Sequence, residues 1–236
     1  MRCRIKGKKT ESEKFAGADS TYTVETMMHD GKALQAGTSH YFGQNFTIPF
    51  DIKFTNRNAE QEYAYQTSWG ISTRLIGAII MAHGDNRGLK LPPAVAPTQV
   101  IIVPINQENE DVQKSVKSLY EQLQESDIRV DIDNRDNYTP GYKFNYWEMK
   151  GVPVRIEVGP RDIENNQCVI TRRDNFEKQV VSLEGINDTI KALMEEIQVN
   201  MFNIVKENMA NKTTSARSLE EFKEQMEANQ GFIKTM

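Results

Sequence analysis

The sequence predicts a mixed α/β protein, α+β overall, with a strand-rich first segment, an α/β domain containing a mostly parallel sheet, and a C-terminal helical extension. Residues 1–90 contain short alternating runs rich in β-branched and aromatic residues, which are typical of strands. Residues 99–185 alternate strand-like and helix-like runs, and residues 186–236 have the apolar spacing of helices. We therefore expect these three segments, with a linker at residues 91–98.

Most of the first segment is predicted to form strands. Residues 20–28 (STYTVETMM) and 50–54 (FDIKF) have the alternation of half-buried strands. Asp30-Gly31 marks a turn before another short strand.

The first segment closes with a predicted helix. Apolar residues fall on one helical face at Ile71, Leu75, Ile79 and Ile80. Ser72 and Thr73 are residue types that start helices, and Gly84 is a stop signal. We therefore expect one helix between these signals.

The second segment follows a proline-rich connector, residues 89–99 (LKLPPAVAPTQ). Residues 99–105 (QVIIVPI) predict a fully buried strand, and residues 109–126 predict a polar amphipathic helix. Further short strands are expected at residues 128–133, 152–159, 167–173 and 178–184. Strands that alternate with helices imply a mostly parallel sheet covered by helices.

A long amphipathic helix is predicted from Ile186 onward. Its apolar face is marked by Ile190, Leu193, Met194, Ile197 and Val205. Residues 215–236 begin another helical element. Together these runs predict the helical extension.

Composition excludes several classes of protein. The chain has 236 residues, 38% hydrophobic and 26% charged, which suits one or two globular domains. No apolar run approaches the ~20 residues that span a bilayer, and no secretory signal is recognisable, so we expect no membrane partner. Cys3 and Cys168 cannot form a cysteine-rich zinc site, and they suit a reducing compartment, most simply the cytoplasm.

The net charge of −4 places a condition on any contact with nucleic acid. A protein without overall positive potential must bind nucleic acid through a local basic patch. Composition alone therefore neither supports nor excludes RNA binding.

Arg74 is the first unusual residue, because it lies in the first turn of the predicted helix. A helix N-terminus carries partial positive charge, so a cation there needs an anionic partner. Free N–H groups at a helix start bind phosphate, and arginine reaches phosphates or stacks on bases. The alternative is a core helix capped by Ser72 or Thr73, with Arg74 extended into solvent.

A second polar stretch is QAGTSHYFGQNF, residues 35–46. Thr38 and His40 are two residues apart, so on a strand they share one face. Gln35 is out of phase with them unless a bulge at Gly37 realigns it. The alternative is a strand with a polar face toward solvent.

These stretches together resemble the prolyl-tRNA synthetases, in their eukaryote- and archaea-like form. The resemblance rests on GKKTESEKFAGA, DGKALQAGTSHYFGQNF, QTSWGISTRLIGAIIMAHGDNRGLKLPP and GVPVRIEVGPRD, in order and over essentially the whole chain. It implies part of a class II catalytic domain, in which an antiparallel sheet holds ATP and proline. An α/β anticodon-binding domain would follow.

The resemblance also implies the residues of the ATP and proline sites. Gln35, Thr38, Ser72 and Arg74 would bind ATP, which arrives with Mg²⁺. Phe15, His40 and Trp69 would line the proline site. Activation is an attack by the proline carboxylate on the α-phosphate, which requires positioning and charge neutralisation. We therefore predict no catalytic acid or base, no metal site and no zinc in this chain.

The anticodon-binding residues are expected in residues 141–173, where aromatic and basic residues interleave. Six basic side chains (Lys143, Lys150, Arg155, Arg161, Arg172, Arg173) accompany four acidic ones (Glu148, Glu157, Asp162, Glu164). Arginine suits guanine and phosphate, and a carboxylate can accept from guanine. The resemblance implies that Glu148, Arg155, Arg161 and Asp162 read the anticodon or support the reading residues. The alternative is a solvated surface of mixed charge.

The chain departs from the family pattern at both ends. Motif 1, motif 2 with its phosphate-binding arginine, and a Thr-x-Glu loop would precede the matched region, and a cysteine zinc site would follow it. We therefore expect a piece of a proline–tRNA ligase that is inactive alone, with L-proline, ATP and proline tRNA as partners and a homodimer at full length. A standalone tRNA-binding or regulatory module is the alternative. A cofactor-binding α/β domain is weaker, because the sequence contains no GxGxxG motif or P-loop.

Overall fold

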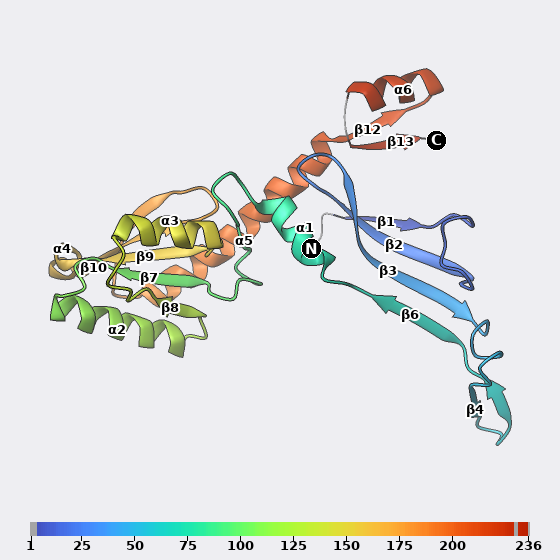
Figure 1. The fold of residues 1–236 in the computed structure, drawn as a ribbon, viewed down its shortest axis with the longest axis horizontal. Coiled ribbons are helices and arrows are strands. Elements are labelled where there is room, and N and C mark those ends of the chain that lie inside the picture. The colour runs from blue at the N-terminus through green and yellow to red at the C-terminus, as the bar shows by residue number, and fades with distance from the viewer. Residues whose placement is uncertain (1–3, 229–230, 236) are drawn as a thin grey trace. The chain divides into compact units, whose positions relative to one another are not determined.

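A computed structural model describes residues 4–228 and 231–235 (Figure 1). The chain forms two compact units, residues 1–82 with 206–236, and residues 83–205. In the described part of the chain, no helix combines the length and apolar character that crossing a membrane requires. Cys3 lies outside the described residues.

A four-stranded antiparallel sheet forms most of the first unit. Its strands are β1 (Ile5–Lys8), β2 (Ser20–Met27), β3 (Ala33–Gly43) and β6 (Gln66–Gly70), in the order β1-β2-β3-β6. All three neighbouring pairs are antiparallel. The expected antiparallel sheet is therefore confirmed.

The β2–β3 ladder contains an irregularity at the polar stretch of β3. Val24 pairs with Gly37 and the next residue, Glu25, pairs with Gln35, so Ala36 is an extra residue on β3. An extra residue shifts the alternation of side chains by one position. It brings Gln35 into phase with Thr38, as a bulge at Gly37 was expected to do, but the extra residue is Ala36.

A hairpin and a helix complete residues 1–82. β4 (Lys53–Thr55) pairs with β5 (Gln61–Tyr63), so the strand expected at residues 50–54 begins later than predicted. α1 (Arg74–His83) starts directly after Thr73 and ends before Gly84. Both signals for this helix are thus confirmed.

The second unit contains a five-stranded mixed sheet. In the order β11-β10-β9-β7-β8, its strands are β11 (Lys178–Ser182), β10 (Gln167–Arg172), β9 (Val154–Val158), β7 (Val100–Pro104) and β8 (Val130–Ile132). β7 pairs in parallel with β8 and β9, whereas β10 pairs antiparallel with β9 and β11. The expectation of a mostly parallel sheet is correct only for the β8–β7–β9 half. The β9–β10 and β10–β11 connections are too short for the crossover that parallel pairing requires.

Helices cover both faces of this sheet. α2 (Glu110–Glu125) and α5 (Ile186–Asn211) contribute to one apolar core, and α3 (Pro140–Lys150) packs against the other face. Successive residues of β7 alternate between these cores: Ile102 faces the first, and Ile101 and Val103 face the second. All five residues of β7 are buried, which explains its uninterrupted apolar sequence.

Part of the expected linker packs in the second unit. The Arg129 guanidinium donates to the carbonyl oxygens of Pro93 and Ala96, at 2.8 Å each. Gln99 Nε2 donates to the Pro93 carbonyl at 3.1 Å, and Ala96 is fully buried. The proline-rich segment is therefore held against the α/β unit by hydrogen bonds to its backbone.

The C-terminal extension is not purely helical. α5 is followed by β12 (Thr213–Ala216), α6 (Leu219–Ala228) and β13 (Phe232–Thr235). β12 and β13 pair in parallel, so the two strands and α6 form a βαβ unit. The prediction of two helices is correct, but the strand pair was not foreseen because both strands are short and only partly apolar.

Ile156→Ala should lower the free energy of unfolding by about 2–5 kcal/mol, because it opens a cavity in the core of the second unit. Ile156 is fully buried on β9. Val180→Ala on β11 is the control, since Val180 is exposed and its truncation should change stability by less than about 0.5 kcal/mol. Equal changes in chemical denaturation would contradict this description of the core.

Candidate functional site

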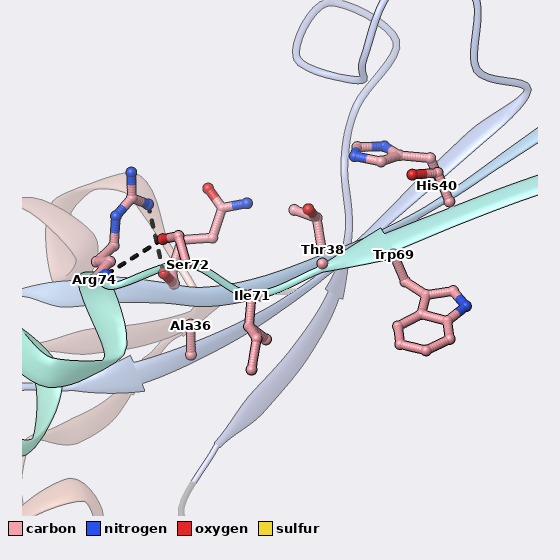
Figure 2. Close-up of a pocket in the computed structure, with 11 residues that line it drawn as sticks. Ala36, Thr38, His40, Trp69, Ile71, Ser72 and Arg74 are labelled. Atoms are coloured by element: carbon pink, nitrogen blue, oxygen red, sulfur yellow. Dashed lines mark hydrogen bonds between the residues drawn. The ribbon is translucent and has the colours of Figure 1, made fainter.

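A cavity of about 410 Å³ lies in the first unit, where β3 and β6 meet the start of α1 (Figure 2). Six of the seven residues predicted to bind ATP or proline line it: Gln35, Thr38, His40, Trp69, Ser72 and Arg74. The other lining residues are Ala36, Gly37, Ser68, Gly70 and Ile71. Residues from two separate motifs therefore meet at one place.

Arg74 lies at the rim of this cavity as the first residue of α1. The Ser72 hydroxyl accepts a hydrogen bond from the Arg74 backbone N–H at 3.3 Å, which forms a local turn directly before the helix. The Arg74 guanidinium reaches across to the Gln35 carbonyl, with Nη1 to O at 3.5 Å. This contact is long, and Arg74 is exposed. Its donors thus remain accessible to an anionic ligand, and a solvent-facing arginine also fits this geometry.

His40 is held in a small aromatic cluster. Its Nδ1 lies 2.9 Å from the hydroxyl oxygen of Thr21, which is its register partner on β2. Its ring centroid lies 5.1 Å from that of Phe15 and 5.7 Å from that of Phe42. The Phe15 backbone N–H donates to the same Thr21 hydroxyl at 3.3 Å. Phe15 and His40 are therefore neighbours, and Thr21, which sequence reasoning missed, ties them together.

Trp69 does not converge with His40. The register pairs Trp69 with Ser39 and Ser68 with His40, which places Trp69 and His40 on opposite faces of the sheet. Figure 2 shows the indole pointing away from Thr38 and His40. Trp69 is 79% exposed and also lines a second cavity of about 500 Å³, with Tyr22 and Ile71. Trp69 and His40 thus both line the first cavity but extend from opposite faces of the sheet, and Ser68 is the register partner of His40.

Two of the predicted anticodon-binding residues pair with each other. Arg155 on β9 is 5% exposed. Its Nη1 lies 3.0 Å from Glu148 Oε1 on α3, and its Nη2 lies 2.9 Å from Glu157 Oε1. A buried arginine requires such partners, because an uncompensated charge would be strongly destabilising. Arg155 therefore orients Glu148 in this structure.

The other two predicted residues lie beyond the opposite end of β9. Asp162 Oδ2 accepts a hydrogen bond from the Gly159 backbone N–H at 2.8 Å, so this carboxylate caps α4 (Pro160–Glu164). Arg161 is exposed on the same short helix. Arg155 thus holds Glu148 near the start of β9, whereas Arg161 and Asp162 follow its end, where Arg161 is the more exposed side chain.

A further ion pair joins the segment after α1 to the mixed sheet. The Arg173 guanidinium binds both oxygens of Asp85, at 2.9 and 2.7 Å, and Lys90 Nζ lies 3.1 Å from the same carboxylate. The hydrogen bonds from Arg173 hold the pKa of Asp85 well below its ordinary value. The sequence suggested only a helix stop here, since nothing local points to a partner so far along the chain.

Among residues 4–228 and 231–235, no group of three or more His, Cys, Asp or Glu side chains is placed to hold a metal ion. Burial raises the pKa of the Cys168 thiol to about 12, and the nearby Asp162 carboxylate adds to this shift. Cys168 therefore remains a neutral thiol near pH 7, and we assign it no ligand role.

Comparison with known proteins identifies relatives of this chain. Residues 99–193 match the family described as "Anticodon binding domain". The chain is 55% identical over 230 residues to a proline–tRNA ligase of Alkaliphilus oremlandii, and 53% and 55% identical over 232 residues to proteins named proline–tRNA ligase 2 of Clostridioides difficile and Bacillus thuringiensis. Each match covers 98% of this chain and 48% of the relative. The chain thus spans about half the length of the curated relatives it matches.

Asp85→Asn should lower the free energy of unfolding at pH 7 by about 3 kcal/mol, because it leaves Arg173 buried without its carboxylate. The folded-state pKa of Asp85 is lowered, so its stabilisation is complete above pH ~4 and is lost as the pH falls further. Chemical denaturation at pH 7 and near pH 2.5 should therefore show a smaller difference between variant and parent in acid. Glu125→Gln, at an exposed position, is the control. If the difference in unfolding free energy between variant and parent did not depend on pH, the assigned pairing of Asp85 with Arg173 would be contradicted.

Proposed function

We propose that this chain performs part of the function of a proline–tRNA ligase. The proposal rests on its homology to these ligases over the half of their length that it spans. Residues 99–193 would bind the anticodon region of proline tRNA. The antiparallel sheet would supply one side of the site where ATP and L-proline react. The observation that carries the proposal is identity above 50% over 98% of the chain, together with the match to an anticodon-binding domain.

The cavity between β3, β6 and α1 supports a role in holding nucleotide. The exposed Arg74 guanidinium at the start of α1 offers donors to the phosphates of ATP. Gln35 and Thr38 face the same space from β3 because of the irregularity at Ala36. Mg²⁺ would enter with ATP and be held chiefly by the phosphates, since this cation retains water and needs few protein ligands.

The aromatic cluster supports a role in holding proline. Phe15 and His40 offer flat surfaces to a small apolar ring, and Thr21 fixes the orientation of the imidazole. The reaction would join the proline carboxylate to the α-phosphate and release pyrophosphate. Such a displacement depends on alignment and charge neutralisation, so the side chains act by binding and not as general bases. Trp69 faces away from His40 and is left out of this proposed proline pocket.

The α/β unit supports a role in reading the anticodon. We assign Glu148 to the acceptance of hydrogen bonds from the N1–H and N2 amine of guanine. Arg155 holds that carboxylate in place at 3.0 Å. Arg161 is exposed and would meet the RNA directly, whereas Asp162 supports the turn that presents it. Glu148 and Arg161 would thus be the contacting residues, and Arg155 and Asp162 their supports.

A standalone tRNA-binding or regulatory module is the second candidate. It is favoured by the completeness of the α/β unit, which contains its own core and closed ion-pair networks. The two candidates differ in the first unit, which only the ligase requires. Homodimerisation of a full-length ligase and residence in the cytoplasm are further parts of the first proposal.

The chain by itself should bind proline tRNA and give no proline-dependent ATP–pyrophosphate exchange above background. The reason is that it carries an anticodon-binding domain but spans only about half of its relatives. Exchange that appears on addition of the remaining part of the Alkaliphilus oremlandii ligase would favour the ligase over the standalone module. Exchange by the chain alone would contradict the view that it holds only part of the site.

Glu148→Gln should reduce discrimination between proline tRNA and a tRNA whose anticodon guanines are replaced, by about 1–3 kcal/mol, because the amide loses an acceptor that guanine requires. Filter binding at constant salt measures both affinities. Glu164→Gln, an exposed position on α4, is the control. Unchanged discrimination in Glu148→Gln would remove Glu148 from the reading residues.

A further inference from the structure

Residues 84–90 (GDNRGLK) form a fixed loop in the second unit. The Asp85–Arg173 pair holds one side of the loop, and the Leu89 backbone N–H donates to the Met149 carbonyl at 3.0 Å. Gly88 has φ +126°, and a Cβ there would lie 2.6 Å from the Met149 carbonyl oxygen. This backbone conformation and close approach require glycine. The loop therefore presents its side chains in a defined position.

Arg87 is the side chain that this loop presents next to Glu148. Its backbone N–H donates to Asp85 Oδ1 at 2.8 Å, its guanidinium carbon lies 4.4 Å from the centre of the Phe176 ring, and its Nη1 lies 3.5 Å from Glu148 Oε2. The Arg87 side chain is nevertheless 63% exposed. Phe176 thus supports one face of the guanidinium, and much of the group remains open to solvent.

Arg87 is not needed to neutralise the Glu148 carboxylate. Arg155 already binds Glu148 at 3.0 Å from a buried position, with shorter and better-shielded contacts than Arg87 makes. An exposed ion pair at 3.5 Å adds little stability, because water screens it. Arg87 is therefore available for a second anionic partner.

The surroundings of Arg87 make a local basic patch on an acidic protein. Two groups of ion pairs lie here: Arg87, Arg155 and Lys178 pair with Glu148 and Glu157, and Lys90 and Arg173 pair with Asp85. The Glu148 and Glu157 side chains are 15% and 13% exposed, whereas those of Arg87 and Lys178 are 63% and 55% exposed. Among these ion-paired groups the charge presented to solvent is thus positive, although the chain carries −4 overall.

We propose that Arg87 binds a backbone phosphate of the anticodon loop, beside the base that meets Glu148; this rests on the function proposed above. A guanidinium offers only donors and matches phosphate oxygens in a planar fork. Stacking on Phe176 fixes the plane of that fork before RNA arrives. A phosphate contact adds affinity without reading sequence, which distinguishes Arg87 from Glu148.

The test uses the full chain and two RNAs, an anticodon stem-loop of proline tRNA and the same stem-loop with its anticodon guanines replaced. Arg87→Gln should weaken binding of both RNAs by the same factor, about fourfold near 0.15 M salt. It should also make the plot of log affinity against log salt less steep by about 0.7, the value for one phosphate contact on a single strand. Arg87→Lys should restore the salt slope. Lys117→Gln on α2, at a comparably exposed position, should change neither quantity.

Three results would overturn the proposal. If Arg87→Gln keeps the affinity and salt slope of the parent chain, Arg87 makes no phosphate contact, although the proposed function stands. If Arg87→Gln loses only the preference for the guanine-containing RNA, with the slope unchanged, Arg87 acts through Glu148. If the parent chain binds neither RNA, the proposed function fails together with this inference. Thermal unfolding of each variant separates these effects from loss of the fold.

Discussion

The buried guanidinium of Arg155 is the interaction on which the second unit depends most. It lies on β9 and is compensated by Glu148 from α3, by Glu157 on its own strand, and by the Thr171 hydroxyl on β10 at 3.4 Å. A charge buried this deeply is stable only when all of its partners are in place. The contacts of Arg155 therefore fix α3, β9 and β10 relative to one another. Arg173 repeats the arrangement one strand away, where it binds Asp85 and the Glu148 carbonyl at 2.8 Å. Two buried arginines therefore hold α3 in place beside the predicted anticodon-binding residues.

The first unit is organised by strand register. Its cavity exists because the irregularity at Ala36 turns Gln35 toward Thr38, and because α1 begins where β6 ends. Its sheet also leaves Trp69 and Ile71 exposed on the face opposite His40, whereas β7 of the second unit is buried throughout. One unit has a self-contained core, and the other carries a half-open cavity and an uncovered apolar face. This contrast agrees with a chain that spans about half the length of its relatives.

Electrostatics connects these features to the proposed function. An acidic chain can approach RNA only through a region where cations are exposed and carboxylates are covered. The patch around Arg87 has this arrangement. It places residues 84–90, in which the sequence indicated only the end of a helix, next to residues expected to read the anticodon. Contacts with Phe176 and with partly buried carboxylates hold these cations in place before binding, which reduces the entropy lost when RNA is bound.

The sequence by itself determined the local elements, including both signals for α1 and the apolar run of β7, because these depend on residues that are near neighbours in the chain. It also identified six of the residues that line the cavity, through the resemblance of two motifs. Only the tertiary structure decided that β10 and β11 run antiparallel, that Trp69 faces away from His40, and that Asp85 meets Arg173 across 88 residues. The physical reason is that a strand presents alternate residues to opposite faces, so one shift of register exchanges the faces. Which strands pair, and in which register, depends on partners distant in the chain.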